Sequence, residues 1–190
     1  MGDVIVLDLE TQKTFDEVGG RSNLHLLRVS VVGLYSYAKD AFSTYTEWET
    51  PGLRSLLEQA ELVVGFNIKR FDFLVLEPYL KKSLRHLPTL DIMEEVERHL
   101  GHRLSLETIA RATLAAGKSG SGLDAIKYFR AGEMDKLKSY CLDDVRLTRD
   151  LYEYGKRHGV IKYDRGGSIY NIPVNWTARS ASAPSSTPLR

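Results

Sequence analysis

The chain has 190 residues, of which 43% are hydrophobic and 27% charged, with a net charge of +1. This composition is typical of a folded globular chain of about one domain, and it excludes a mainly disordered protein, a fibrous protein and a small disulfide scaffold. The chain has a single cysteine, no apolar run of the roughly 18 residues that span a bilayer, and no basic segment that would start a secretory signal. We therefore expect a cytoplasmic protein with no membrane partner.

The first half of the chain predicts strands interrupted by short helices. Apolar and β-branched runs predict strands over residues 4–7, 24–37, 42–48 and 62–64. Pro51 is well placed to open a helix over 51–59. A second helix is expected over 68–80, with Asn67 as its N-cap.

The second half is expected to be mostly helical. Helices are predicted over 105–116, with Ser105 as N-cap, over 123–131 and over 136–154, and a strand pair over 160–163 and 169–174. This order predicts an α/β fold in which helices flank a mixed central sheet. We expect one domain over residues 1–176 and a disordered tail, rich in Ser, Ala and Pro, over 177–190.

Two carboxylates end the first predicted strand. Alternation along a strand places Asp8 and Glu10 on the same side, roughly 6.6 Å apart. Like charges side by side at the rim of a core are costly unless a cation neutralises them. For an isolated pair, the simpler interpretation is a strand that runs out into solvent.

A third carboxylate belongs to the helix expected after residue 67. Helical spacing puts Asp72 on one face with Val75, Leu76 and Tyr79, and this apolar face is expected to pack inward. The alternative is an exposed aspartate in the first turn, which the helix dipole favours. The neighbouring Lys69 and Arg70 could contact a nucleic-acid backbone or be simply solvated.

A fourth carboxylate lies in the last long helix. Tyr140 and Asp144 are four residues apart, about 6 Å along a helix axis, and head a stripe that continues through Leu147 and Leu151. Asp143 faces elsewhere. The alternative is a partly buried aspartate paired with an arginine.

Considered together, the segments could supply four converging carboxylates. Their combined charge of about −4 would be balanced by two divalent cations. Hard oxygen ligands without a nearby set of Cys and His select Mg²⁺ or Mn²⁺ over zinc. Two such ions stabilise the attacking and the leaving oxygen in phosphodiester hydrolysis.

Three motifs in this order resemble the DEDD exonucleases of the ribonuclease-H-like superfamily, in their tyrosine subtype. They are LDLET over residues 7–11, GFNIKRFD over 65–72 and YCLDD over 140–144. The resemblance covers roughly residues 3–157. This part of the sequence is similar to the proofreading domains of family B DNA polymerases and to stand-alone or helicase-linked ribonuclease-H-like domains. The histidine subtype would need a histidine at position 139, which is Ser139.

This resemblance implies a ribonuclease-H-like fold and removal of nucleotides from the 3′ end of DNA or RNA, with single-stranded DNA favoured. It implies two Mg²⁺ or Mn²⁺ ions, and a helicase or polymerase would be a fitting protein partner. The resemblance implies that four carboxylates bind the metals: Asp8, Glu10, Asp72 and Asp144. It implies that Tyr140 orients the attacking water. It also implies that three further residues contact the terminal nucleotide: Thr11, Asn67 and Phe71.

Two other functions stay open on the sequence alone. The chain could be a non-catalytic nucleic-acid-binding or scaffolding module with a nuclease fold, or a structure-specific endonuclease that uses the same metals. The presence of all four carboxylates and the tyrosine favours an exonuclease over a scaffold.

Overall fold

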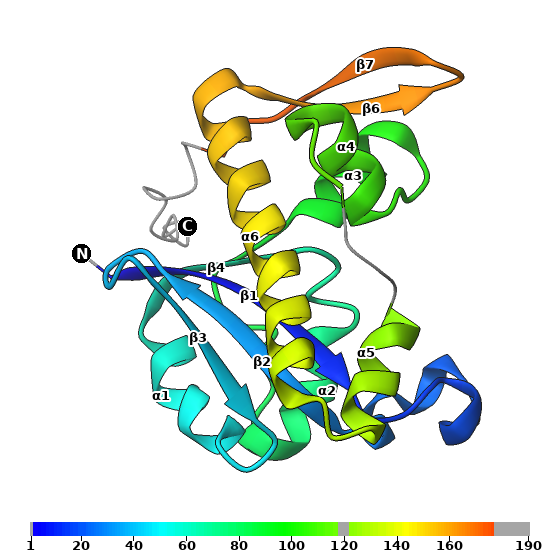
Figure 1. Ribbon diagram of the computed structural model, residues 1–190. Helices are drawn as coiled ribbons and strands as arrows, with labels where there is room; N and C mark the ends of the chain where they lie inside the picture. Colours follow the sequence, from blue (N-terminus) through cyan, green and yellow to red (C-terminus); the bar gives the residue numbers. More distant parts are fainter. Residues whose placement is uncertain (1, 118–121, 177–190) are drawn as a thin grey trace, which may run out of the picture.

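A computed structural model describes residues 2–117 and 122–176 of the chain (Figure 1). Its strands are β1 (Asp3–Thr11), β2 (Val29–Ser36), β3 (Ala41–Thr46), β4 (Ala60–Gly65), β5 (Thr89–Asp91), β6 (Val160–Arg165) and β7 (Ser168–Pro173). Its α-helices are α1 (Leu53–Glu58), α2 (Asp72–Leu80), α3 (Ile92–Leu100), α4 (Leu106–Leu114), α5 (Gly122–Arg130) and α6 (Met134–His158). Short 3₁₀ turns are η1 (Asp16–Val18), η2 (Arg21–Leu26) and η3 (Thr50–Gly52). The predicted tail over 177–190 lies outside the described residues.

The centre of the fold is a mixed five-stranded sheet in the order β3-β2-β1-β4-β5. β1 pairs with β2 antiparallel and with β4 parallel, so it lies in the middle of the sheet. β6 and β7 form a separate antiparallel hairpin. The expected α/β fold with a mixed sheet flanked by helices is therefore confirmed.

The two faces of β1 belong to different cores, as its alternation predicted. Ile5, Leu7 and Leu9 pack in one core with residues of α1 and α2. Val6 packs in the other with residues of α3, α4 and α6. The long helix α6 crosses this second face of the sheet (Figure 1). Side chains of β1 that share a face with Val6, including Asp8 and Glu10, thus lie on the side of α6.

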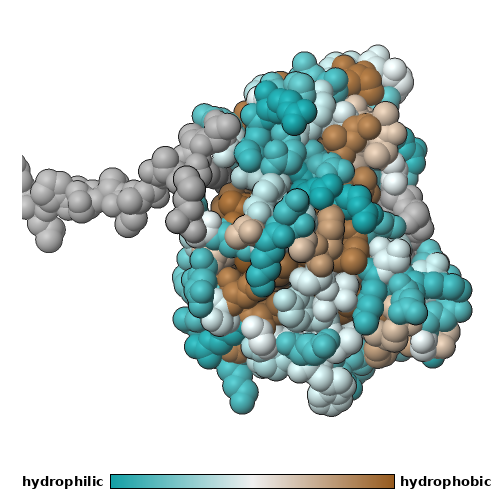
Figure 2. Space-filling model, turned by 60° about the vertical axis from the view of Figure 1, so that its left-hand side comes forward, coloured by the Kyte–Doolittle hydropathy of each residue, from teal (hydrophilic) through white to brown (hydrophobic). Residues whose placement is uncertain are grey.

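On the face that Figure 2 shows, hydrophilic and apolar side chains both reach the surface, and the apolar ones gather across the middle and extend toward the upper right. Among the helices of residues 2–117 and 122–176, none has both the length and the apolar composition that crossing a membrane would require.

Two local expectations were wrong. The second strand begins at Val29 because its pairing with β1 ends at Thr11 opposite Val29, and the preceding apolar residues form the 3₁₀ turn η2. Asn67 is not a helix cap. It has a left-handed backbone with φ 65°, and α2 begins only at Asp72. The segment over 89–100, which the sequence analysis left unassigned, forms β5 and α3.

Candidate metal centre and active site

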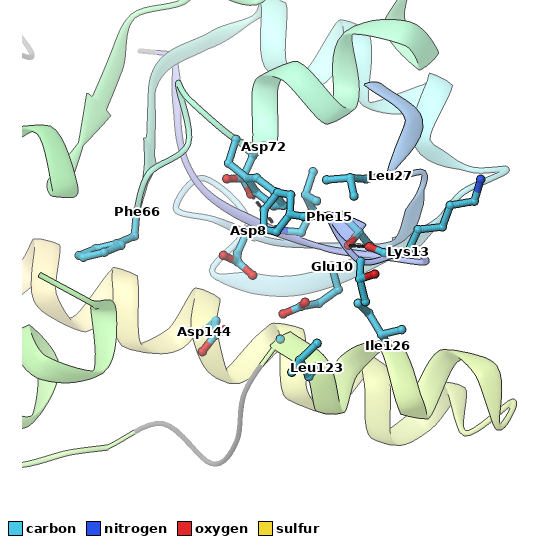
Figure 3. A pocket seen from close by; sticks show the side chains of 15 residues that line it. Asp8, Glu10, Lys13, Phe15, Leu27, Phe66, Asp72, Leu123, Ile126 and Asp144 are labelled. Atoms are coloured by element: carbon cyan, nitrogen blue, oxygen red, sulfur yellow. Dashed lines mark hydrogen bonds between the residues drawn. The ribbon is translucent and has the colours of Figure 1, made fainter. Parts of the chain in front are cut away.

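A pocket of about 430 Å³ opens beside the end of β1 and collects residues from five parts of the chain (Figure 3). Its walls come from β1 and the loop after it, from Leu27 before β2, and from the 66–72 segment, α5 and α6. The lining residues are Asp8, Leu9, Glu10, Thr11, Lys13, Thr14, Phe15, Leu27, Phe66, Phe71, Asp72, Gly122, Leu123, Ile126 and Asp144.

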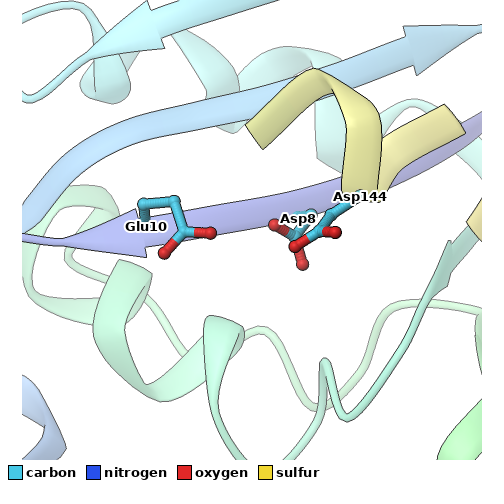
Figure 4. A group of neighbouring side chains, drawn as sticks. All are labelled: Asp8, Glu10 and Asp144. Atoms are coloured by element: carbon cyan, nitrogen blue, oxygen red, sulfur yellow. The ribbon is translucent and has the colours of Figure 1, made fainter. Parts of the chain in front are cut away.

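Three of the four predicted carboxylates meet in this pocket. Asp8, Glu10 and Asp144 each offer an oxygen within 4.8 Å of the others (Figure 4). The first two project from β1 toward α6, and Asp144 projects from α6 toward β1. Asp144 is only 2% exposed and Glu10 9%, so the group is not a solvated acidic patch.

The close approach of α6 to β1 depends on a glycine in β2. Gly33 pairs with Asp8 in the sheet. A Cβ atom on Gly33 would lie 2.8 Å from Cys141 Sγ and 2.9 Å from Val145 Cγ2, both on α6. Cys141 Sγ lies 3.6 Å from the carbonyl oxygen of Asp8, to which its thiol donates. The missing side chain therefore lets α6 sit close enough to bring Asp144 to Asp8.

The fourth carboxylate approaches from the opposite side of β1. The described pairing of β1 with β4 ends at Val6 and Val64, so the following residues of β1 extend past β4. The backbone N–H of Leu9 donates there to Asp72 Oδ1 at 3.0 Å. Asp72 is 3% exposed, at the first residue of α2. It lines the same pocket but lies outside the group of three.

The segment that carries Asp72 is held by a buried aspartate that the sequence analysis missed. Asp91 accepts hydrogen bonds from the backbone N–H groups of Asn67 at 2.9 Å and Lys69 at 3.1 Å. It also caps α3 through the N–H of Met93. A recognisable signal was present, because Asp91 directly precedes an amphipathic stretch, as N-caps do.

The electrostatics of the pocket are those of an anionic site. Burial raises the pKa of Asp72 well above its usual range, and the charge of Asp8 raises it further. The pKa of the Cys141 thiol is also raised well above its usual value, first by burial and then by the charges of Asp8, Glu10 and Asp144. Carboxylates that are this close together and largely shielded from water need a cation to be ionised together without a large cost. The group that could hold a cation among the described residues offers carboxylate oxygens, a set that fits Mg²⁺ or Mn²⁺.

Of the other residues predicted for the site, some line the pocket and some do not. Thr11 and Phe71 line the pocket, whereas Asn67 does not. Tyr140 lies one helical turn before Asp144, is 5% exposed and packs in a core cluster with Val31. It is not among the residues that line the pocket.

Several apolar lining residues were not predicted. Phe15 contacts Phe71 edge-on, with ring centroids 6.0 Å apart. Leu123 and Ile126 of α5 form the opposite wall (Figure 3). No spacing rule connects these residues with the carboxylate motifs, because only the tertiary fold brings Phe15 and α5 to the same pocket.

The comparisons with known proteins agree with this architecture. A model of the RNase H superfamily, RNase_H_2, matches residues 5–155. The chain therefore belongs to the RNase H superfamily. Among solved structures, it is similar to the family B DNA polymerase from the hyperthermophilic archaeon Pyrobaculum calidifontis, with a TM-score of 0.62 and 16% identity. That match covers 82% of this chain and 24% of the polymerase, so the chain spans about a quarter of that protein. No curated protein matches.

Proposed function

We propose that this protein is a 3′–5′ exonuclease of the DEDD type, tyrosine subtype, which uses two divalent ions and prefers single-stranded DNA, with RNA as a second substrate. The convergence of Asp8, Glu10 and Asp144, with Asp72 on the wall of the same pocket, is the observation that carries this proposal. Membership of the RNase H superfamily supports a nucleic-acid substrate.

The four carboxylates would hold two Mg²⁺ or Mn²⁺ ions. When bound, such ions make water nucleophilic near neutral pH and stabilise the leaving oxygen. The N–H of Leu9 donates to Asp72 Oδ1, and the thiol of Cys141 lies 3.9 Å from Asp8 Oδ2, so both carboxylates have a protein donor before any ligand arrives. Because these carboxylates are already positioned, the protein does not have to reorganise them during the reaction step.

Apolar and polar residues would have different parts in binding the terminal nucleotide. Phe15, Phe71 and Leu123 would cover the terminal nucleotide and exclude water around it. Thr11, which lines the pocket, and Asn67, which follows the lining residue Phe66, are proposed to lie near that nucleotide. Tyr140 would orient the attacking water as a hydrogen-bond partner. Because Tyr140 does not line the pocket, this role predicts that its ring turns toward the pocket when a strand binds.

The experiment that tests the proposal is digestion of end-labelled oligonucleotides. Single- and double-stranded DNA and RNA, labelled at the 5′ end, are incubated with Mg²⁺, with Mn²⁺ or with chelator. We expect a ladder of products that shorten stepwise from the 3′ end, only when a divalent ion is present. A strand blocked by a 3′-terminal phosphate is the control for the need of a free end.

Other outcomes would reject the proposal in distinct ways. Internal cuts in circular DNA would identify an endonuclease that uses the same carboxylates. Binding of nucleic acid without metal-dependent cleavage would identify a scaffold. Shortening from the 5′ end would reject the proposed polarity.

A further inference from the structure

A second hollow, of about 370 Å³, lies next to the segment that carries Asp72. We call it the basic groove. It is lined by Lys69, Arg70, Phe73, Leu74, Arg85, Thr89 and Glu94. Residues 69 and 70 line the groove, and the next two residues, Phe71 and Asp72, line the pocket with the carboxylates. Since consecutive Cα atoms are about 3.8 Å apart, the backbone of Arg70, which lines the groove, lies within about 8 Å of that of Asp72, which lines the pocket.

The two hollows have opposite charge. Three cations and a single carboxylate line the basic groove, whereas the pocket has Asp8, Glu10, Asp72 and Asp144 against Lys13. A polyanion would therefore be attracted to the groove and repelled by the metal-free pocket.

The cations of the groove are available to a ligand. Lys69 pairs with Glu94 at 2.7 Å and Arg70 with Glu97 at 2.6 Å, but these side chains are 38% and 46% exposed. Ion pairs as exposed as these contribute about 0–1 kcal/mol, so a phosphate can replace the carboxylate partner. Within residues 2–117 and 122–176, the Arg85 side chain takes part in no ion pair or hydrogen bond.

The groove is built on a rigid base. Backbone N–H groups of Asn67 and Lys69 are fixed by buried Asp91, and Phe73 below the groove is 1% exposed. The backbone that positions Lys69 is thus held independently of its side-chain ion pair. A neutral side chain at 69 or 85 should remove charge without moving the turn.

From this geometry we infer that the basic groove binds the phosphate backbone of a single strand whose 3′ end occupies the pocket, a few nucleotides before that end. The inference rests on the proposed function, because the pocket must hold a 3′ end. It gives Lys69, Arg70 and Arg85 a part in substrate affinity and none in the cleavage step.

The test compares short and long single strands. Binding of fluorescent oligothymidylates of about 4 and about 20 nucleotides is measured by anisotropy with Ca²⁺ in place of Mg²⁺, since Ca²⁺ also takes oxygen ligands, and gel analysis verifies that the strands stay intact. Arg85→Gln and Lys69→Gln are compared with Arg157→Gln, an exposed arginine at the far end of α6 that lines neither hollow. Thermal unfolding of each variant verifies that it is folded.

We expect each groove variant to bind the long strand about fivefold more weakly, the effect of losing one charge contact about 4 Å away in water. The slope of log affinity against log salt should fall by about 0.7 for each lost contact. Affinity for the short strand, and all affinities of Arg157→Gln, should stay as in the wild type. In steady-state digestion of the long strand, KM should rise and kcat should not change.

The contrary results are separable. Equal binding of the long strand by wild type and both groove variants would overturn the groove while leaving the exonuclease intact. Equal weakening for short and long strands would place these cations at the pocket and overturn the inference in its stated form. A wild type that binds neither strand would reject the groove and the proposed function together.

Discussion

At the scale of single residues, burial distinguishes two adjacent aspartates on α6. Asp144 is buried and meets Asp8 and Glu10, whereas Asp143 is partly exposed and pairs with Arg146 on the surface of α6. The two adjacent aspartates alone do not indicate which one belongs to the site. The helical stripe of Tyr140, Asp144 and Leu147 indicates Asp144, and the structure agrees with that stripe.

This difference predicts unequal effects of the same substitution. Asp144→Asn should lower kcat/KM by at least about a thousandfold, since several kcal/mol of transition-state stabilisation depend on the carboxylate and each 1.36 kcal/mol is about tenfold. Asp143→Asn, the matched control, should change it less than about twofold. Both rates are measured by release of nucleotides from single-stranded DNA in Mg²⁺. Equal rates for the two variants would contradict the site assignment.

The buried Asp72 predicts how stability depends on pH. Its pKa is raised in the folded protein, first by burial and then by Asp8, so the folded protein binds this proton more tightly than the unfolded chain. The stability that Asp72 contributes is therefore fully present below its ordinary pKa of about 3.8 and is lost as pH rises through the raised value. Asn at position 72 keeps an acceptor for the N–H of Leu9 and has no such loss.

The measurement is urea unfolding in chelator at about pH 4 and about pH 7. We expect the free energy of unfolding of the wild type to fall more between these values than that of Asp72→Asn. A wild-type curve with the same pH dependence as that of Asp72→Asn would show that Asp72 does not hold its proton in the folded state.

At the scale of elements, the site depends on how closely α6 packs on β1 and β2. Gly33→Ala would place a methyl group within 3.0 Å of both Cys141 and Val145. Helix α6 then has to move outward and take Asp144 with it. We expect about 1–3 kcal/mol less stability from overpacking, measured by urea unfolding, and a loss of activity at temperatures where the variant is still folded.

A compensating change tests the cause. Cys141→Ala removes one of the two clashing groups, so the double variant Gly33→Ala/Cys141→Ala should recover part of the activity that Gly33→Ala loses. Wild-type stability and activity in Gly33→Ala would mean that the glycine does not set the helix position.

Elements whose signal is local were predictable, and those that depend on partners were not. The alternation of β1 and the stripe on α6 follow from side-chain periodicity, and both were placed correctly. Asn67 looked like a helix cap, but Asp91, 24 residues further on, binds its backbone N–H and delays the helix to Asp72. Strand β5 has only three residues, too few for a period to be visible.

At the scale of the whole molecule, the order of the strands in the sheet brings the carboxylates of the site together. β1 lies between β2 and β4, so Gly33 and α6 reach Asp8 from one side and Asp72 reaches Leu9 from the other. The order of the motifs predicted that these segments belong together. It could not predict that a carboxylate oxygen of Asp72 accepts from the backbone N–H of Leu9, or that Phe15 and α5 close the pocket, because those contacts depend on loop and helix placement.

The most direct test of the central claim is a count of the cations that the carboxylates hold. Electron paramagnetic resonance of free Mn²⁺ during a titration gives the number of ions bound per chain, without substrate and without activity. The account predicts two ions for the wild type and for Asp143→Asn, and fewer for Asp8→Asn and Asp144→Asn. Absence of Mn²⁺ binding by the wild type, or an undiminished count in both carboxylate variants, would contradict it.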